Sequence, residues 1–300
     1  MTSVVASMSP RIAIIGAASS LGARLVHAFP SSCVPVLRVS AGWANEVIVS
    51  DYENLLPSDI DGCTHVVNCV GVTKGTADVF RRVNVDLVAH LIDISKQIGA
   101  GYFLQISSFS VFGNILCVDR SSQVAPINDY GRSKLASERA LVAASNANFI
   151  VAIVRLPAIF GAGSADKLMS LCRRWLSLGA FIKPRADVRR SMISVSAASQ
   201  VIAGLLASRR GGMFLAADPV PFSYGLALEE MRTNGFPRLR VFTVPASLAA
   251  LVAAISPRLA RSLLTDCYLV DADNVVVELG VGTDLASFIA RIAHERAGRG

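Results

Sequence analysis

Charged residues are scarce in this 300-residue sequence: they make up 17% of it, whereas hydrophobic residues make up 52%. Such a composition supports a sizeable core and excludes an intrinsically disordered chain. The six cysteines form no Cys-x-x-Cys pair, and the four histidines lie far apart. We therefore expect no disulfide framework and no metal site, and we expect buried thiols in a protein of a reducing compartment.

Long apolar runs are also missing. A membrane-spanning helix needs about 20 consecutive apolar residues, and the longest candidate, residues 244–256, contains Pro245 and ends before Pro257 and Arg258. The first ten residues carry no basic cluster followed by an apolar segment. These absences predict a cytoplasmic protein with no signal peptide and no membrane span.

The formal net charge of +7 is spread along the chain. Arginine clusters occur, but aromatic residues do not alternate with them as they do in nucleic-acid-binding surfaces, so no nucleic-acid partner is expected. A basic balance does suit an enzyme whose cofactor and substrate both carry phosphate groups.

One polar segment, residues 129–134, reads Asp-Tyr-Gly-Arg-Ser-Lys and opens an apolar-periodic run. The pattern predicts a helix with Asp129 as its N-cap. Residues four apart share a helix face, so we expect Tyr130 and Lys134 to point the same way, either into a site or on a solvated face. A nearby ammonium would lower the pKa of the Tyr130 phenol and make it an acid or base near neutral pH. Ser108, in the loop after a predicted buried strand, could bind the same substrate oxygen.

A short apolar run, residues 11–15, is followed by a turn with Gly16, Ser19 and Gly22 and then by a helical pattern. Strand, glycine turn and helix in this order are the context of a dinucleotide-binding fingerprint, in which the helix N-terminus receives a pyrophosphate. Strand and helix patterns then alternate up to residue 155, with a long amphipathic helix predicted at 77–98. This alternation predicts an α/β fold with a doubly wound parallel sheet.

The glycine turn, the Ile-Ser-Ser-x-x-Val-Phe-Gly of residues 106–113 and the Tyr-Gly-x-Ser-Lys of residues 130–134 together resemble the extended short-chain dehydrogenase/reductases, the NAD(P)-dependent nucleotide-sugar epimerase/dehydratase family. The resemblance implies a Rossmann-type NAD(P)-binding domain of residues 10–156, to which residues 188–210 return. It also implies a smaller C-terminal substrate-binding lobe, made of residues 157–187 and 211–300.

The family's glycine pattern is Gly-x-x-Gly-x-x-Gly, and here Ser19 replaces the middle glycine. A serine hydroxyl can still donate a hydrogen bond to a phosphate. The resemblance implies that the cofactor is bound by Gly16, Ser19, Ser20, Leu21, Gly22, Arg38, Asp51, Val70, Gly71, Tyr130, Lys134 and Pro157.

The second predicted strand, residues 34–40, bears on the choice between NAD and NADP. An acidic residue at the end of this strand binds the ribose 2′-hydroxyl of NAD. None is present, and Arg38 and Ser40 stand there instead, which favours NADP(H), with NAD(H) as the alternative. Asp51 matches a family aspartate near the adenine, and a helix cap is the equal alternative reading.

The resemblance implies that Ser108, Tyr130 and Lys134 are catalytic, and that Ser108, Phe109 and Arg190 bind a nucleotide-sugar substrate. Family dehydratases carry an Asp-Glu pair where this chain has Phe109 and Ser110, so dehydration is disfavoured. Reduction of a 4-keto-sugar nucleotide is the preferred reaction. An NAD-dependent 4-epimerase and a non-catalytic cofactor-binding scaffold are the alternatives. Helices at 77–98 and 129–147 suggest a homodimer interface.

Overall fold

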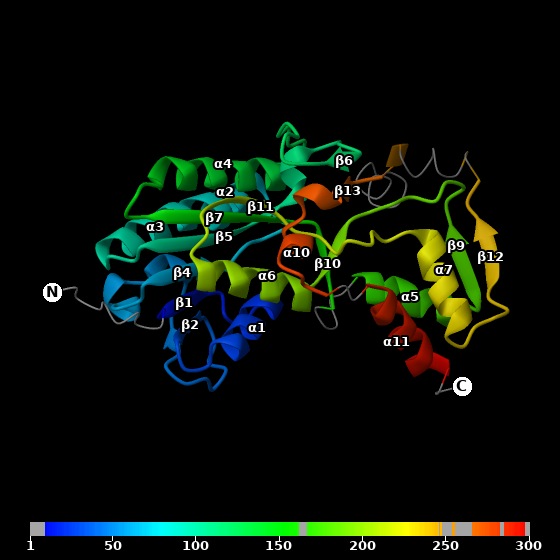
Figure 1. Ribbon diagram of the computed structural model, residues 1–300, viewed down its shortest axis with the longest axis horizontal. Helices are drawn as coiled ribbons and strands as arrows, with labels where there is room; N and C mark the ends of the chain where they lie inside the picture. Colours follow the sequence, from blue (N-terminus) through cyan, green and yellow to red (C-terminus); the bar gives the residue numbers. More distant parts are fainter. Residues whose placement is uncertain are drawn as a thin grey trace. The chain divides into compact units, whose positions relative to one another are not determined.

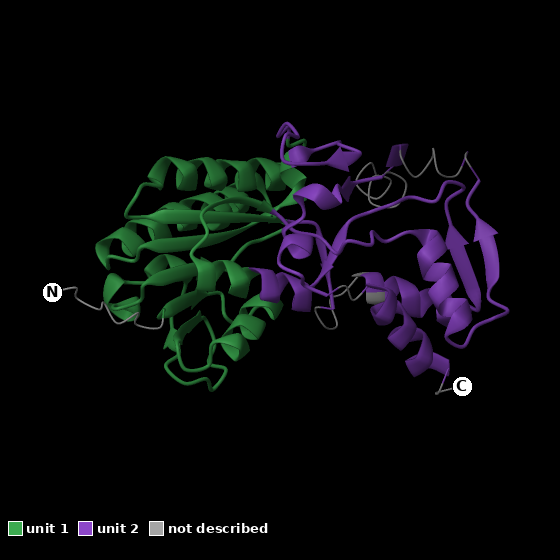
Figure 2. Cartoon of the chain, in the orientation of Figure 1, with its two compact units in different colours: residues 1–111, 126–155, 202–214 green, residues 112–125, 156–201, 215–300 purple. Residues whose placement is uncertain are grey.

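The computed structural model describes residues 10–161, 167–245, 247, 254–255, 266–282 and 285–297. Its chain divides into two compact units, which Figure 2 colours separately. Unit 1 contains residues 1–111, 126–155 and 202–214, and unit 2 contains residues 112–125, 156–201 and 215–300. Each unit is therefore assembled from three separate stretches of chain.

A seven-stranded sheet forms the centre of unit 1 (Figure 1). Its strands are β1 (Ile12–Ile15), β2 (Cys33–Leu37), β3 (Val47–Ile48), β4 (His65–Asn68), β5 (Tyr102–Ser108), β7 (Ile150–Leu156) and β11 (Gly212–Leu215). The spatial order is β11-β7-β5-β4-β1-β2-β3. This is the order of a doubly wound fold, in which the direction of winding reverses between β1 and β4. The predicted fold class is confirmed.

The central strands are buried on both faces, as parallel strands covered by helices must be. All four residues of β1 are completely buried. Strand β1 pairs in parallel with β2 on one side and with β4 on the other, and β4 pairs in parallel with β5. The carboxyl ends of β1 and β4 therefore lie side by side at the switch point, where ligands of such folds bind.

Helices cover both faces of this sheet (Figure 1). One face carries α2 (Ala77–Arg81), the π-helical turn η3 (Arg82–Asp86), α3 (Leu87–Gln97) and α4 (Asp129–Ala144). The other face carries α1 (Ser20–Ala28) and α6 (Val195–Ser208). Three 3₁₀ turns complete the connections: η1 (Tyr52–Asn54), η2 (Pro57–Ile60) and η4 (Phe109–Phe112).

The helix predicted at 77–98 is present as the continuous helical run of α2, η3 and α3, which ends at Gln97. Its π turn η3 carries Asn84, whose side chain hydrogen-bonds to Val72 N. Two details of the second predicted helix are wrong. The helix predicted at 129–147 ends at Ala144, because the chain closes a bridge between Asn146 and Phe149. The N-cap is Asn128, whose side chain accepts a hydrogen bond from Gly131 N, so Asp129 is already helical.

The second strand also differs from its prediction. Strand β2 ends at Leu37 instead of continuing to residue 40. Val39 is 76% exposed, so the apolar side chains that suggested a strand here are buried only as far as Leu37. Arg38 and Ser40 therefore belong to the loop that follows the strand.

Unit 2 contains short parallel strand pairs and a separate apolar core. Its strands are β6 (Cys117–Val118), β8 (Ala158–Phe160), β9 (Ala180–Lys183), β10 (Met192–Ser194), β12 (Arg240–Thr243) and β13 (Tyr268–Leu269). Its helices are α5 (Lys167–Leu178), α7 (Tyr224–Thr233), η6 (Asp271–Asp273), α10 (Val275–Glu278) and α11 (Leu285–Ala297). Aromatic rings fill the core, with Trp175 and Phe181 at 4.2 Å and Phe160 and Phe288 at 5.0 Å between ring centroids.

Within the described residues, no helix combines the length and apolar character that crossing a membrane requires. Part of the 244–256 segment considered above lies outside the described residues.

Candidate active site

The first turn of α4 places Tyr130 and Lys134 beside the end of β5. Asn128 caps the helix by accepting a hydrogen bond from Gly131 N at 2.7 Å. Gly131 is buried, and a Cβ at that position would overlap the carbonyl oxygen of Ser110. The absence of a side chain at Gly131 therefore lets the helix start lie directly against the Ser108–Ser110 segment.

Ser108 and Tyr130 are brought together, as the sequence predicts. Ser108 is the last residue of β5, and its hydroxyl hydrogen-bonds to the Tyr130 phenol. The Ser108 Oγ also lies 3.2 Å from the Oγ of Ser110. The Phe80 ring packs 6.1 Å from the Tyr130 ring, measured between centroids.

Lys134 is buried, with only 5% of its surface exposed. Its Nζ donates a hydrogen bond to the main-chain oxygen of Ile106 at 3.0 Å. Burial lowers the pKa of Lys134 to about 8, and the carboxylate of Glu138, one helical turn further on, raises it in part. Lys134 can therefore exchange its proton close to neutral pH.

The prediction that Lys134 lowers the pKa of Tyr130 is wrong for this structure. Burial raises the pKa of Tyr130, and the hydrogen bond with Ser108 offsets only part of that effect. Lys134 Nζ donates a hydrogen bond to the main-chain oxygen of Ile106. Tyr130 is consequently a neutral phenol at neutral pH, able to donate a proton.

A buried ion pair lies one turn beyond Lys134. Glu138 and Arg155 are 2% and 7% exposed, and two hydrogen bonds of 3.0 and 2.7 Å join the guanidinium of Arg155 to the carboxylate. Ser107 donates a third hydrogen bond to the same carboxylate at 2.5 Å. These contacts connect α4, β7 and β5 directly beneath the candidate catalytic residues. Neither Glu138 nor Arg155 belongs to a recognisable sequence motif, and the one local signal is the position of Glu138 four residues after Lys134.

Asn84 joins the exit of β4 to α4. Its side-chain oxygen accepts a hydrogen bond from Val72 N at 3.0 Å, and its nitrogen donates to Val72 O and to the Ser133 hydroxyl. A Cβ at Gly71 would lie 3.1 Å from Lys134 Nζ and 3.5 Å from the Asn84 oxygen. The π turn that carries Asn84 is a feature common near functional sites.

The glycine turn after β1 has the geometry of a phosphate cradle. Gly16 has a φ of +79°, and a Cβ there would meet Val70 Cγ2 at 2.7 Å. Ser19 caps α1 by accepting a hydrogen bond from Gly22 N at 3.0 Å, and a Cβ at Gly22 would overlap Gly16. The turns after β1 and β4 thus pack against each other at the switch point, and the exposed N-terminus of α1 fits a dinucleotide pyrophosphate. Ser20 and Leu21 form the first turn of α1.

The loop after β2 contains an acidic group that the strand pattern did not reveal. Arg38 is exposed immediately after the strand. Glu46 folds back on this loop, where its carboxylate accepts hydrogen bonds from the Ser40 hydroxyl and from the main-chain nitrogens of Ala41 and Trp43. These contacts, chiefly that of Ser40, lower the pKa of Glu46. The end of β2 itself carries no acidic residue, as the sequence shows, and Glu46 reaches the loop from six residues beyond Ser40.

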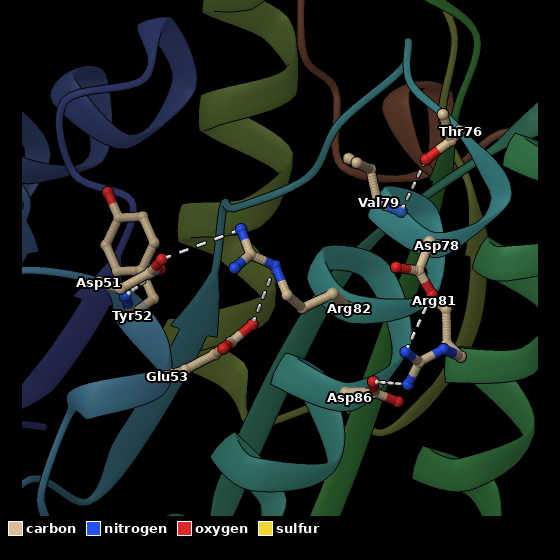
Figure 3. A network of polar contacts seen from close by, with 9 residues as sticks. All are labelled: Asp51, Tyr52, Glu53, Thr76, Asp78, Val79, Arg81, Arg82 and Asp86. Carbon is tan, nitrogen blue, oxygen red and sulfur yellow. Dashed lines mark hydrogen bonds and ion pairs between the residues drawn. The ribbon is translucent and has the colours of Figure 1, made fainter.

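Asp51 is both a cap and part of a surface ion-pair network (Figure 3). Its carboxylate accepts a hydrogen bond from Tyr52 N at 2.7 Å and lies 4.0 Å from the guanidinium of Arg82. Arg82 also approaches Glu53, at 3.5 Å. The helix-cap reading of Asp51 is thus confirmed, and the adenine contact stays a prediction.

The remaining predicted residues lie in different places. Phe109 is buried in unit 1, directly after Ser108. Pro157 and Arg190 belong to unit 2. The main chain of Arg190 exchanges two hydrogen bonds of 2.8 Å with Phe222. Burial raises the pKa of Tyr224, and the Arg190 guanidinium lowers it in part.

Comparisons with known proteins agree with this fold. The model of the NAD dependent epimerase/dehydratase family matches residues 12–192. Among curated proteins, none matches the chain.

Solved structures share the fold at low sequence identity. The UDP-Glc/GlcNAc 4-epimerase from Campylobacter jejuni superimposes with a TM-score of 0.73 at 17% identity, covering 97% of this chain and 100% of that chain. WbmH from Bordetella bronchiseptica, in complex with NAD⁺, gives 0.70 at 15% identity, with 97% and 99% covered. RMD from Pseudomonas aeruginosa, complexed with NADPH, gives 0.68 at 17% identity, with 97% and 100% covered.

Proposed function

Because the chain belongs to the NAD dependent epimerase/dehydratase family, we propose that this enzyme reduces a 4-keto-sugar nucleotide with the aid of a nicotinamide cofactor. The observation that carries the proposal is the neutral Tyr130 phenol, hydrogen-bonded to Ser108 and followed one turn later by the buried Lys134. A reduction needs a proton donor at the substrate oxygen, and a protonated tyrosine is such a donor.

The roles of the residues follow from their placement. A bound nicotinamide cofactor would supply the hydride. The Ser108 hydroxyl binds the substrate carbonyl oxygen and holds it beside Tyr130, whose phenol donates a proton to that oxygen. Lys134, one turn further along α4 and with a pKa of about 8, supplies the proton that returns to the phenol after turnover.

We propose that the cofactor is NADP(H). Arg38 follows β2 directly and is exposed, so its guanidinium is available to a ribose 2′-phosphate. NAD(H) is the alternative, and the structures with the same fold include complexes of both kinds. Titration of the purified protein with NADPH and NADH decides between them.

An NAD-dependent 4-epimerase is the second candidate. The C. jejuni structure, which shares the fold, is a 4-epimerase of UDP-glucose and UDP-GlcNAc. An epimerase retains its cofactor and returns the same hydride, whereas a reductase consumes reduced cofactor in proportion to product. Stoichiometric loss of NADPH absorbance with a 4-keto-sugar nucleotide supports the reductase, and interconversion of UDP-sugars without net loss supports the epimerase.

The Tyr130→Phe variant tests the common core of both candidates. We expect turnover to fall by about a hundredfold or more, because general acid catalysis contributes about 10²–10⁴-fold, while cofactor affinity changes little. Tyr268→Phe is the matched control, because it makes the same substitution in unit 2. The ring at this position packs against Arg189, and a phenylalanine ring keeps that contact. Turnover by Tyr130→Phe equal to that of the control would refute the proposed role.

A further inference from the structure

The loop after β2 forms a small anion-binding concavity that the protein fills with its own carboxylate. Ala41 N and Trp43 N donate to Glu46 Oε2 at 3.1 and 3.0 Å, and the Ser40 hydroxyl donates to Oε1. Gly42, with a φ of +73°, provides the turn that aims these donors at one point. Successive main-chain N–H groups arranged in this way bind anions in many proteins.

The position of the loop identifies which anion would compete with Glu46. The loop begins at the carboxyl end of β2, the strand next to β1 in the sheet. In doubly wound folds this end of the second strand meets the ribose 2′ position of a dinucleotide whose pyrophosphate lies at the helix after β1. Arg38, at the start of the same loop, adds a positive charge there.

We propose that Glu46 is an internal competitor of the NADP 2′-phosphate and thereby reduces the preference for NADP(H) that Arg38 confers. The phosphate requires the donors that Glu46 now occupies, and two anions at one point repel each other. Glu46 therefore has to leave the loop before the 2′-phosphate can enter. NAD(H), which carries only a hydroxyl at this position, leaves Glu46 in place. This inference rests on the proposed cofactor binding.

Binding measurements on charge-matched variants test the inference. Glu46→Gln removes the negative charge but keeps the side-chain length. Glu278→Gln makes the same charge change on α10 in unit 2, and serves as the control. Each form is titrated calorimetrically with NADPH, with NADH and with adenosine 2′,5′-bisphosphate, which carries the 2′-phosphate without the nicotinamide.

We expect Glu46→Gln to lower the Kd for NADPH and for adenosine 2′,5′-bisphosphate by about tenfold, which corresponds to the loss of one competing charge-assisted contact. The Kd for NADH should stay within about twofold. Arg38→Ala should have the opposite effect, raising the Kd for NADPH alone.

Two results overturn the inference while leaving cofactor binding intact. One is an equal change in the affinities for NADPH and NADH, which would mean that Glu46 only supports the loop. The other is the same gain in Glu278→Gln, which would reflect net charge. If none of the forms binds either cofactor, the inference and the proposed function both fail.

Discussion

Breaking the buried ion pair between Glu138 and Arg155 should destabilise the protein beside the candidate active site. The substitution Glu138→Gln keeps the shape of the side chain but leaves the Arg155 guanidinium without its counter-charge. Both side chains are less than a tenth exposed, and the pair is joined by two hydrogen bonds from Arg155 and one from Ser107. Water cannot replace the lost carboxylate at this depth.

The size of the effect follows from that burial. Removing one partner of a buried pair costs about 3–5 kcal/mol, because the other charge stays in a medium that solvates it poorly. The same substitution at Glu295, whose pair with Arg173 spans 3.3 Å and is more than half exposed on both sides, should cost less than about 1 kcal/mol. Replacing both buried partners, as Glu138→Leu with Arg155→Met, should recover much of the loss.

Urea unfolding of the four forms measures these free energies. The pH dependence of turnover provides a second readout. The Glu138 carboxylate raises the pKa of Lys134 against the effect of burial, so in Glu138→Gln this pKa should fall below about 8 and the alkaline limb of activity should move to lower pH. Equal destabilisation by Glu138→Gln and Glu295→Gln, together with an unmoved alkaline limb, would refute the reasoning.

Three further predictions concern the rest of the molecule. Gly131→Ala should lower kcat by about ten- to a hundredfold while changing cofactor affinity little, because a Cβ would push α4 away from the Ser110 carbonyl; steady-state kinetics and cofactor titration measure both. His65 has its pKa lowered from 6.5 to about 4 by burial and by Arg209, so the folded state takes up its proton later than the unfolded chain as the pH falls. Stability should therefore drop by about 3 kcal/mol from pH 6.5 to pH 4, a loss absent from His65→Phe in urea unfolding at each pH. Arg190→Ala should raise the KM for the nucleotide sugar about ten- to a hundredfold if its guanidinium binds the diphosphate, and an unchanged KM in the double variant with Arg189→Ala would contradict that role.

The sheet was predictable because its strands are short apolar runs between glycine turns and helical patterns. Burial on both faces leaves this signature in the sequence itself. The helix boundaries were harder to predict from the sequence. Asn128 and Asp129 are both good N-caps, and only the position of Gly131 against the neighbouring loop selects Asn128. The π turn at Asn84 is held by hydrogen bonds to Val72 and Ser133, contacts between segments that are distant in the sequence.

In the candidate site, too, some features could be predicted from the sequence and others could not. The sequence predicted that Ser108 and Tyr130 lie close together, because Ser108 ends a strand and Tyr130 lies at the start of the helix that packs beside it. It could not give the pKa of Tyr130, which depends on how deeply the phenol is buried and on Lys134 turning to Ile106. Glu46 escaped notice because its carboxylate reaches back six residues to Ser40, a contact that exists only once the loop has folded.

The interleaving of the two units has a consequence for the order in which the chain can fold during synthesis. The last stretch of unit 1, residues 202–214, follows two stretches of unit 2 along the chain. It contains most of β11, the strand at the edge of the sheet next to β7. A ribosome that has just released residue 155 has therefore delivered six of the seven strands, and β7 stays an open sheet edge. Unit 1 must wait, with this edge uncovered, until more than fifty further residues have emerged, the interval between residues 155 and 212.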